Sequence, residues 1–173
     1  MPPRRRPLWL VAALTVLSAG IYLPLWFGFS WSELRRETAN ERMEPAWHAL
    51  SIFVPGYGSW QVYRHFAAIA AVLDRVGSTF KVDPFSATIG ALLWYLTWFH
   101  YSAEPIFALL NAAEVLAGTA VVVYGQRALN EYWRQRPGPP VEERVLETDW
   151  IAIAAAATLF VAILVSYATT PTN

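Results

Sequence analysis

The chain has 173 residues, of which 55% are hydrophobic and 15% are charged, whereas a soluble domain is usually about 45–50% apolar and about 25% charged. The apolar content excludes a disordered chain. The balance of 13 basic against 13 acidic residues excludes a basic nucleic-acid-binding protein. Cysteine is absent, which excludes disulfides and thiolate metal sites. The composition therefore favours a small polytopic membrane protein that is embedded in the lipid bilayer.

The charged residues are unevenly spaced and leave five long runs almost free of charge. A helix needs about 20 residues to cross hydrocarbon that is about 30 Å thick. Lipid cannot satisfy free backbone groups, so helices are the expected form of each run. We therefore predict an all-α polytopic membrane helix bundle, a single membrane domain over residues 1–173 with five transmembrane helices at about 8–29, 46–63, 84–101, 105–125 and 150–168.

The first apolar run, residues 8–29, follows three arginines, so its start resembles a signal peptide. Its length exceeds the apolar core of a signal peptide, which is about 7–15 residues, so we predict a retained span. The spacing of Ser30 and Glu33 is that of a capping box, which opens helices. It predicts an amphipathic helix over residues 31–43.

The second run carries Pro-Gly-Tyr-Gly at residues 55–58, in the middle of its predicted span. Proline removes a helical hydrogen bond, so a kinked span, a broken helix and a re-entrant segment are all open. A kinked span is favoured because membrane helices tolerate proline and glycine. An apolar stripe at helical spacing then predicts an amphipathic helix over residues 64–76 that ends at Gly77.

The later runs have clearer boundaries. Asp83-Pro84 is a cap followed by proline, which predicts the start of the third span. The fourth run is predicted to continue as an amphipathic helix over residues 126–135. Thr148 or Asp149 is the predicted cap of the fifth span.

Orientation is predicted from lysine and arginine in short loops, which favour the cytoplasmic side. With five spans and a cytoplasmic N-terminus, ten of the 13 basic residues lie inside. If residues 45–63 do not span, an outside N-terminus gives the same count. Both solutions place the 126–148 connector in the cytoplasm and the C-terminus outside.

A resemblance comes from four short motifs in the first half of the chain. Residues 20–26 read Gly-Ile-Tyr-Leu-Pro-Leu-Trp, and residues 32–37 read Ser-Glu-Leu-Arg-Arg-Glu. Pro-Gly-Tyr-Gly at 55–58 then leads into Tyr-Arg-His-Phe at 63–66. Over roughly residues 4–75 the chain resembles an uncharacterised family of small bacterial integral membrane proteins. The resemblance implies a bacterial inner-membrane location and brings no known activity, cofactor or catalytic residue.

Glu114 is the sharpest polar candidate because it lies inside the fourth apolar run, where a carboxylate costs several kcal/mol unless it is protonated or paired. Asn111 lies one turn before it and Gly118 one turn after. This polar intramembrane face fits a proton relay, an ion site or a hydrogen-bond acceptor for a quinol or pigment. A carboxyl that joins two helices by hydrogen bonds is the simpler interpretation.

The remaining candidates are histidines and arginines. His48 opens the second predicted span and His100 closes the third. Such a pair could ligate haem or bacteriochlorophyll, although interfacial histidines are commonly structural. Arg64 and Arg75 are predicted to bind lipid headgroups. No metal site is predicted.

The sequence contains no phosphate-binding glycine loop, no nucleophile elbow and no zinc-protease motif. We therefore expect a non-enzymatic scaffold or accessory subunit that packs against other membrane proteins or lipids. One alternative is an electron-transfer or photosynthetic subunit that binds haem or pigment. A second is a small transporter or channel built on the broken second span and Glu114.

Overall fold

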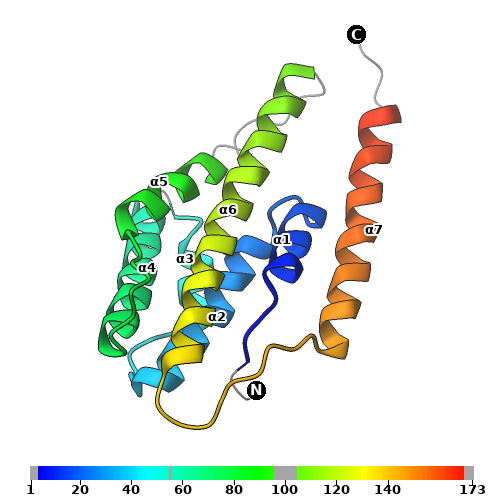
Figure 1. The fold of residues 1–173 in the computed structure, drawn as a ribbon. Coiled ribbons are helices and arrows are strands. Elements are labelled where there is room, and N and C mark those ends of the chain that lie inside the picture. The colour runs from blue at the N-terminus through cyan, green and yellow to red at the C-terminus, as the bar shows by residue number, and fades with distance from the viewer. Residues whose placement is uncertain (1–3, 55, 96–104, 170–173) are drawn as a thin grey trace.

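The computed structural model describes residues 4–54, 56–95 and 105–169, except for the side chains of residues 105, 167 and 168. These residues form helices and no strand, as predicted for an all-α protein. In chain order the helices are α1 (Leu8–Leu17), α2 (Tyr22–Thr38), α3 (Pro45–Ser51), α4 (Tyr57–Arg75), α5 (Pro84–Tyr95), α6 (Pro105–Gln135) and α7 (Glu147–Thr169) (Figure 1).

Two of these helices are long and apolar enough to cross a membrane, in place of the five predicted. They are the segments Ile106–Gln135 of α6 and Glu147–Ser166 of α7. The other helices of the described chain are too short or too polar to do so. Residues 96–101 of the third predicted span lie outside the described residues.

The first predicted span is a helical hairpin and does not cross. Helix α1 has ten residues, so it is about 15 Å long. Ala19 and Gly20 adopt positive φ values of 49° and 87° and turn the chain. Ser18 Oγ then accepts a hydrogen bond from the Tyr22 N–H at 2.9 Å, at the start of α2. Helix α2 continues unbroken to Thr38, so the predicted helix over residues 31–43 is wrong in its start and its end.

Ion pairs show that α2 returns to the end of the molecule where α1 began. Glu33 of α2 binds Arg6, just before α1, at 2.7 Å. Glu37 of α2 binds Arg136, just after α6, at 3.0 Å. A span over residues 8–29 would separate these partners by the thickness of a membrane. The hairpin therefore begins and ends at the same end of the molecule.

The second predicted span is a broken helix, not the kinked span that was favoured. Helix α3 ends at Ser51, and α4 begins at Tyr57 after Gly56, whose φ is 73°. Helix α4 joins the end of the predicted span to the predicted amphipathic helix in one element. Gly77 follows it with φ of 67°, as its predicted role as a stop requires. Helices α3 and α4 thus form a second hairpin.

The later boundaries follow the sequence more closely. The Asp83 carboxylate accepts the Phe85 N–H at 3.0 Å, as a cap of α5 should. Helix α6 runs through both the fourth span and the predicted 126–135 helix. Helix α7 begins at Glu147, earlier than the predicted cap, because Asp149 reaches back to accept the Leu146 N–H at 2.8 Å.

Glycines let bulky rings pack against the backbone in the core. A Cβ on Gly118 of α6 would lie 2.7 Å from Trp94 Cδ1, and one on Gly125 would overlap the Trp26 ring. Trp26 and Trp94 are both fully buried. These contacts hold α6 close to α2 and α5. Helix α7, in contrast, packs among the described helices only on α1.

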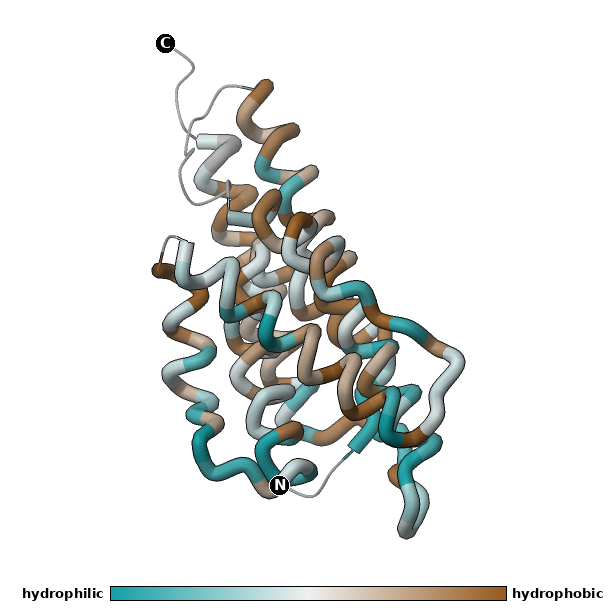
Figure 2. Tube along the Cα trace, turned by 90° about the vertical axis from the view of Figure 1, so that its left-hand side faces the viewer, coloured by the Kyte–Doolittle hydropathy of each residue, from teal (hydrophilic) through white to brown (hydrophobic). Residues whose placement is uncertain are grey.

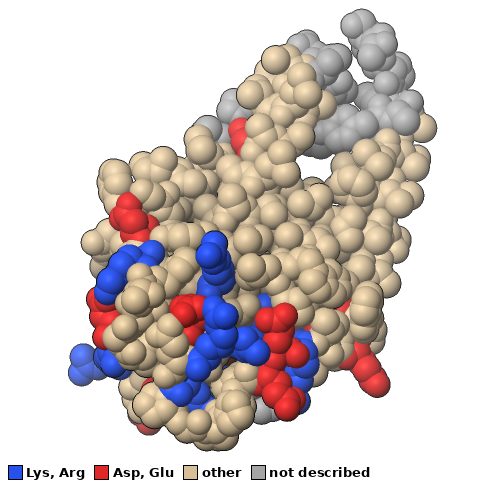
Figure 3. All heavy atoms as spheres, viewed as in Figure 1, with Lys and Arg blue, Asp and Glu red and all other residues tan. Residues whose placement is uncertain are grey.

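Charge and hydropathy divide the molecule along its length. Basic and acidic side chains gather at the end that holds the start of α1 and the end of α6, and the opposite end is almost uncharged on the face shown (Figure 3). Hydrophilic residues are likewise concentrated toward this end of the chain trace, and hydrophobic residues toward the opposite end (Figure 2). We refer to the first region as the charged end.

Candidate functional site

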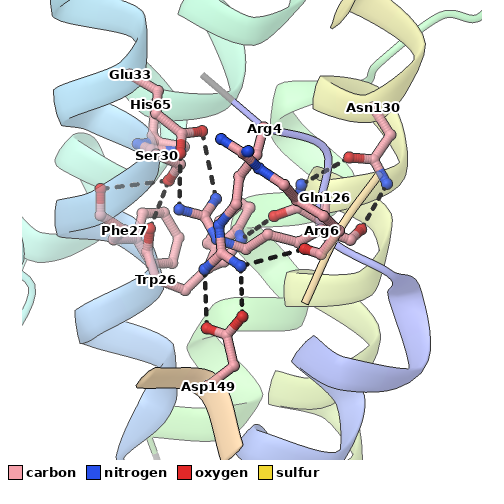
Figure 4. A network of polar contacts seen from close by, with 11 residues as sticks. Arg4, Arg6, Trp26, Phe27, Ser30, Glu33, His65, Gln126, Asn130 and Asp149 are labelled. Carbon is pink, nitrogen blue, oxygen red and sulfur yellow. Dashed lines mark hydrogen bonds and ion pairs between the residues drawn. The ribbon is translucent and has the colours of Figure 1, made fainter. Parts of the chain in front are cut away.

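Two buried ion pairs anchor the N-terminal segment at the charged end. Arg6 donates to both Glu33 oxygens, at 2.7 and 3.3 Å. Arg4 donates to both Asp149 oxygens in α7, one at 2.8 Å. The four side chains are at most 11% exposed. Figure 4 shows the two guanidinium groups between α2 and the start of α7. Because bidentate pairs fix geometry, they position the N-terminal segment and both helices.

A chain of neutral hydrogen bonds extends from Arg6 into the core (Figure 4). Asn130 Nδ2 donates to the Arg6 carbonyl at 2.7 Å, and Gln126 Nε2 donates to Asn130 Oδ1 at 2.9 Å. Trp26 Nε1 donates to Gln126 Oε1 at 2.9 Å. All of these side chains are buried. Helix α6 is thus joined to α2 and to the N-terminal segment by polar contacts.

A cavity of about 600 Å³ opens beside these ion pairs. Its walls come from the N-terminal segment, α2, the connector before α7 and the first turn of α7. The lining residues are Arg4, Arg6, Phe29, Ser32, Glu33, Arg36, Arg144, Leu146, Glu147 and Thr148. We call it the arginine cavity.

A second polar cluster joins the two hairpins through a pair of histidines. His48 Nε2 of α3 lies 2.9 Å from His65 Nδ1 of α4. His65 Nε2 lies 3.1 Å from Ser30 Oγ of α2, whose hydroxyl donates to the Trp26 carbonyl at 2.6 Å. Both imidazoles are at most 2% exposed.

The hydroxyl fixes the tautomers of both histidines. Ser30 Oγ donates its proton to a carbonyl, so it accepts from the Nε2–H of His65. His65 Nδ1 is then an acceptor and takes the Nε2–H of His48. His48 Nδ1 is left with a lone pair and no close hydrogen bond among the described residues, although Gln61 lies near this imidazole.

Aromatic rings enclose the pair and keep both imidazoles neutral. Trp31 stacks on His48 with centroids 3.9 Å apart, and Phe27 meets His65 edge-on at 4.6 Å. Burial lowers the pKa of His48 to about 4, with a further contribution from the charge of Arg64. Burial, followed by the proximity of His48, lowers the pKa of His65 well below its usual value.

The lowered pKa values predict that acid destabilises the fold. An unfolded histidine has a pKa near 6.5, so below that pH the unfolded chain binds more protons than the folded one. The contribution of His48 is complete above pH 6.5 and falls as the pH approaches about 4, a loss of roughly 3 kcal/mol. We expect the midpoint temperature of thermal unfolding, measured in detergent, to decrease as the pH is lowered from 7.5 to 4.5.

The matched variant for this prediction is His48→Phe/His65→Leu, which removes both titrating groups and keeps apolar volume in the ring cluster. Its thermal midpoint should change little between pH 7.5 and 5.5, where carboxylates remain ionised. An equally steep decline in this variant over that range would show that the histidines do not cause the pH dependence.

One alternative from the sequence gave His48 and His100 as a pair of cofactor ligands; in the structure the histidine that contacts His48 is His65. His100 lies outside the described residues. The Nε2 atom of His48 is committed to His65, so axial ligation of a haem through that atom would require the pair to separate. The described residues therefore contain no pair of histidines arranged to ligate a haem or pigment. Ligation by His48 and His100 stays a prediction.

Asn111 and Glu114 lie one turn apart on α6, beyond Gly118 and away from the charged end. Both side chains are partly buried, and neither is isolated from other groups. Arg64 and Arg75 are exposed on α4. They are about 16 Å apart along the helix axis. Arg64 lies over the Trp60 ring at 4.7 Å and donates to Gln61 at 3.4 Å. Of the described site residues, Arg64 acts on the imidazole of His48 through its charge, whereas Arg75 lies about three turns further along α4 and Asn111 and Glu114 lie on α6.

Sequence reasoning missed the residues that do converge. The burial of His65 could have been predicted from the sequence, because it lies on the same apolar stripe of α4 as Val62, Phe66 and Ile69. Arg6 and Glu33 were assigned to opposite sides of a membrane. Their pairing had no signal in a single sequence.

No protein-family model, curated protein or solved structure matches this chain. The family resemblance drawn from residues 4–75 therefore stays a prediction.

Proposed function

We propose that the chain is a non-enzymatic membrane protein, a scaffold or accessory subunit held in the bacterial inner membrane by α6 and α7. The observation that carries the proposal is the exposure of these two helices. In the most apolar window of each, 17% of α6 and 6% of α7 is buried. A helix of this hydropathy in a soluble core would be mostly buried, so lipid or a membrane partner is the natural surrounding.

The half-length hairpins fit the same membrane. Large apolar side chains are exposed on the hairpin helices as well, among them Leu25 on α2 and Trp60 on α4. Trp9 and Trp150, at the starts of α1 and α7, lie 6.0 Å apart, which suits a membrane–water interface at that level. In this arrangement the two hairpins enter from the charged end and return to it.

The charge distribution supports one orientation. No basic residue occurs in residues 96–104, between α5 and α6, or after Arg144. Because the N-terminus lies at the charged end and α6 begins at the opposite end, the chain must also cross between Lys81 and Pro105, in addition to α6 and α7 (Figure 1). In this three-crossing arrangement none of the 13 lysines and arginines lies in a segment on the far side, a stronger bias than ten of 13. The positive-inside rule then places the charged end in the cytoplasm and the end of α7 outside.

Single cysteines test this topology without background, because the chain has none. We expect an impermeant maleimide to label Thr169→Cys on intact cells. It should label Glu142→Cys, in the connector between α6 and α7, only after permeabilisation. Glu41→Cys, in the α2–α3 loop, should behave like Glu142→Cys. Labelling of Glu41→Cys from outside, with Glu142→Cys protected, would contradict the cytoplasmic placement of the hairpin ends and leave the five-span topology open.

The accessory role has its own test. Purified in several mild detergents from its native membrane, the chain should migrate in a complex whose other components are also membrane proteins. A chain that migrates alone in every detergent, while remaining folded, would contradict the accessory role and leave membrane insertion intact.

A further inference from the structure

The arginine cavity is lined by more arginines than its acidic residues neutralise. Arg4 and Arg6 are locked in bidentate pairs with Asp149 and Glu33. Arg36 and Arg144 also line the cavity, and neither forms an ion pair with any residue in the described ranges. Two further arginines, both exposed, therefore lie at a cavity whose own ion pairs are buried and bidentate.

The acidic residues around the cavity do not neutralise Arg36 and Arg144 completely. Glu33 is already bound to Arg6, and Glu147 is the other acidic residue of the lining. With Asp149 counted as the partner of Arg4, four arginines meet three acids, which leaves one positive charge in excess. Guanidinium groups match phosphate oxygens in geometry as well as in charge, so a phosphate ester is the ligand that this wall suits.

One face of α2 leads from the cavity into the apolar part of the molecule. Phe29 lines the cavity and is 51% exposed. Leu25 and Ile21, the residue just before α2, continue from it at spacings of four residues and are 50% and 42% exposed. On a helix these three side chains form a stripe on one face. The same face carries Ser32 and Arg36 at the cavity, so it changes from apolar to cationic along its length.

We propose that the arginine cavity binds the phosphate of an anionic phospholipid, with Arg36 and Arg144 as the donors and with an acyl chain along Ile21, Leu25 and Phe29. The inference rests on the proposed membrane location, because the apolar stripe must face lipid. The cavity lies beside the first turn of α7, just on the polar side of the Trp9–Trp150 pair, which is where a lipid headgroup lies.

The test uses the full-length protein in detergent, titrated with phosphatidylglycerol or phosphatidylcholine and examined by native mass spectrometry. We expect one phosphatidylglycerol to be retained in preference to phosphatidylcholine. Arg36→Gln/Arg144→Gln should weaken that binding about tenfold or more, since two charge-assisted contacts are lost. The matched control, Arg35→Gln/Arg42→Gln, removes the same charge outside the cavity lining and should bind as the native chain does.

Three results of the lipid titration would overturn the proposal, and a competition experiment adds a fourth. The three are equal retention of the two lipids by the native chain, equal weakening in the control variant, and unchanged binding in Arg36→Gln/Arg144→Gln. Displacement of phosphatidylglycerol by millimolar inorganic phosphate would assign the site to a free anion and also overturn it. Failure of the membrane location would appear separately, as release of the chain from membranes by alkaline carbonate.

Discussion

Replacing Glu33 with alanine is expected to lower the free energy of unfolding by about 3–5 kcal/mol, because it leaves the Arg6 guanidinium buried without its partner. The pair is bidentate, and the two side chains are 8% and 5% exposed. Arg6 also presents its carbonyl to Asn130, so its displacement would disturb α6 as well. Few other single changes should cost as much outside the core.

Denaturant titration in detergent micelles measures this effect against two controls. Arg6→Met/Glu33→Leu removes both charges together and should cost much less than either single removal, since no charge is left unpaired. Lys81→Ala breaks an ion pair whose side chains are 72% and 62% exposed, and it should cost under about 1 kcal/mol. If Glu33→Ala were as mild as Lys81→Ala, the pair would not be buried in the folded chain.

The long helices were predictable because their signal is local. Helix α6 joins an apolar run to a continuation at helical spacing and stops before Pro137, and α7 fills the last apolar run. The Asp83-Pro84 start was equally local, since cap and proline are adjacent. Each of these predictions needed only residues within one element.

The five-span topology failed because uncharged length is the same for a crossing helix and for a hairpin. Residues 8–29 are uncharged over a lipid-length run, yet a turn at Ala19 and Gly20 divides them. The turn is stabilised by contact with Trp94, about 75 residues later in the chain, which the local sequence does not contain. The return of α2 depends on Arg6 and Arg136 in the same way.

The histidine cluster shows the same limit at the level of a site. His48 was singled out, but its partner was chosen on the assumption that residues 46–63 cross the membrane. Because these residues fold back, α4 lies beside α3 and His65 contacts His48, whereas His100 lies outside the described residues. The half-length hairpins therefore decide both which groups meet and where the arginine cavity opens.

Both hairpins depend on glycines that bring their turns against α5, and Gly58 should be the least replaceable of them. Gly58→Ala is expected to destabilise the chain by about 3 kcal/mol or more, at the upper end of overpacking effects. A Cβ there would overlap the Ile52 carbonyl and the Tyr95 hydroxyl and would lie 2.9 Å from the Ile52 carbonyl carbon. Backbone atoms cannot move aside as the end of a flexible side chain can.

Helix propensity predicts the opposite sign for Gly58→Ala, which makes the experiment decisive. Gly58 is the second residue of α4, where helix propensity favours alanine over glycine by up to about 1 kcal/mol. Gly56→Ala is the matched control, since a Cβ at Gly56 meets nothing within 4 Å. Only the backbone opposes a side chain there, because φ of 73° with ψ of −51° is a sparsely populated combination, a penalty of about 1–3 kcal/mol. We expect thermal unfolding in detergent to rank the native chain first, Gly56→Ala second and Gly58→Ala last. A stabilised Gly58→Ala would mean that α3 does not fold back against α4, and the histidine pair would lose the hairpin that forms it.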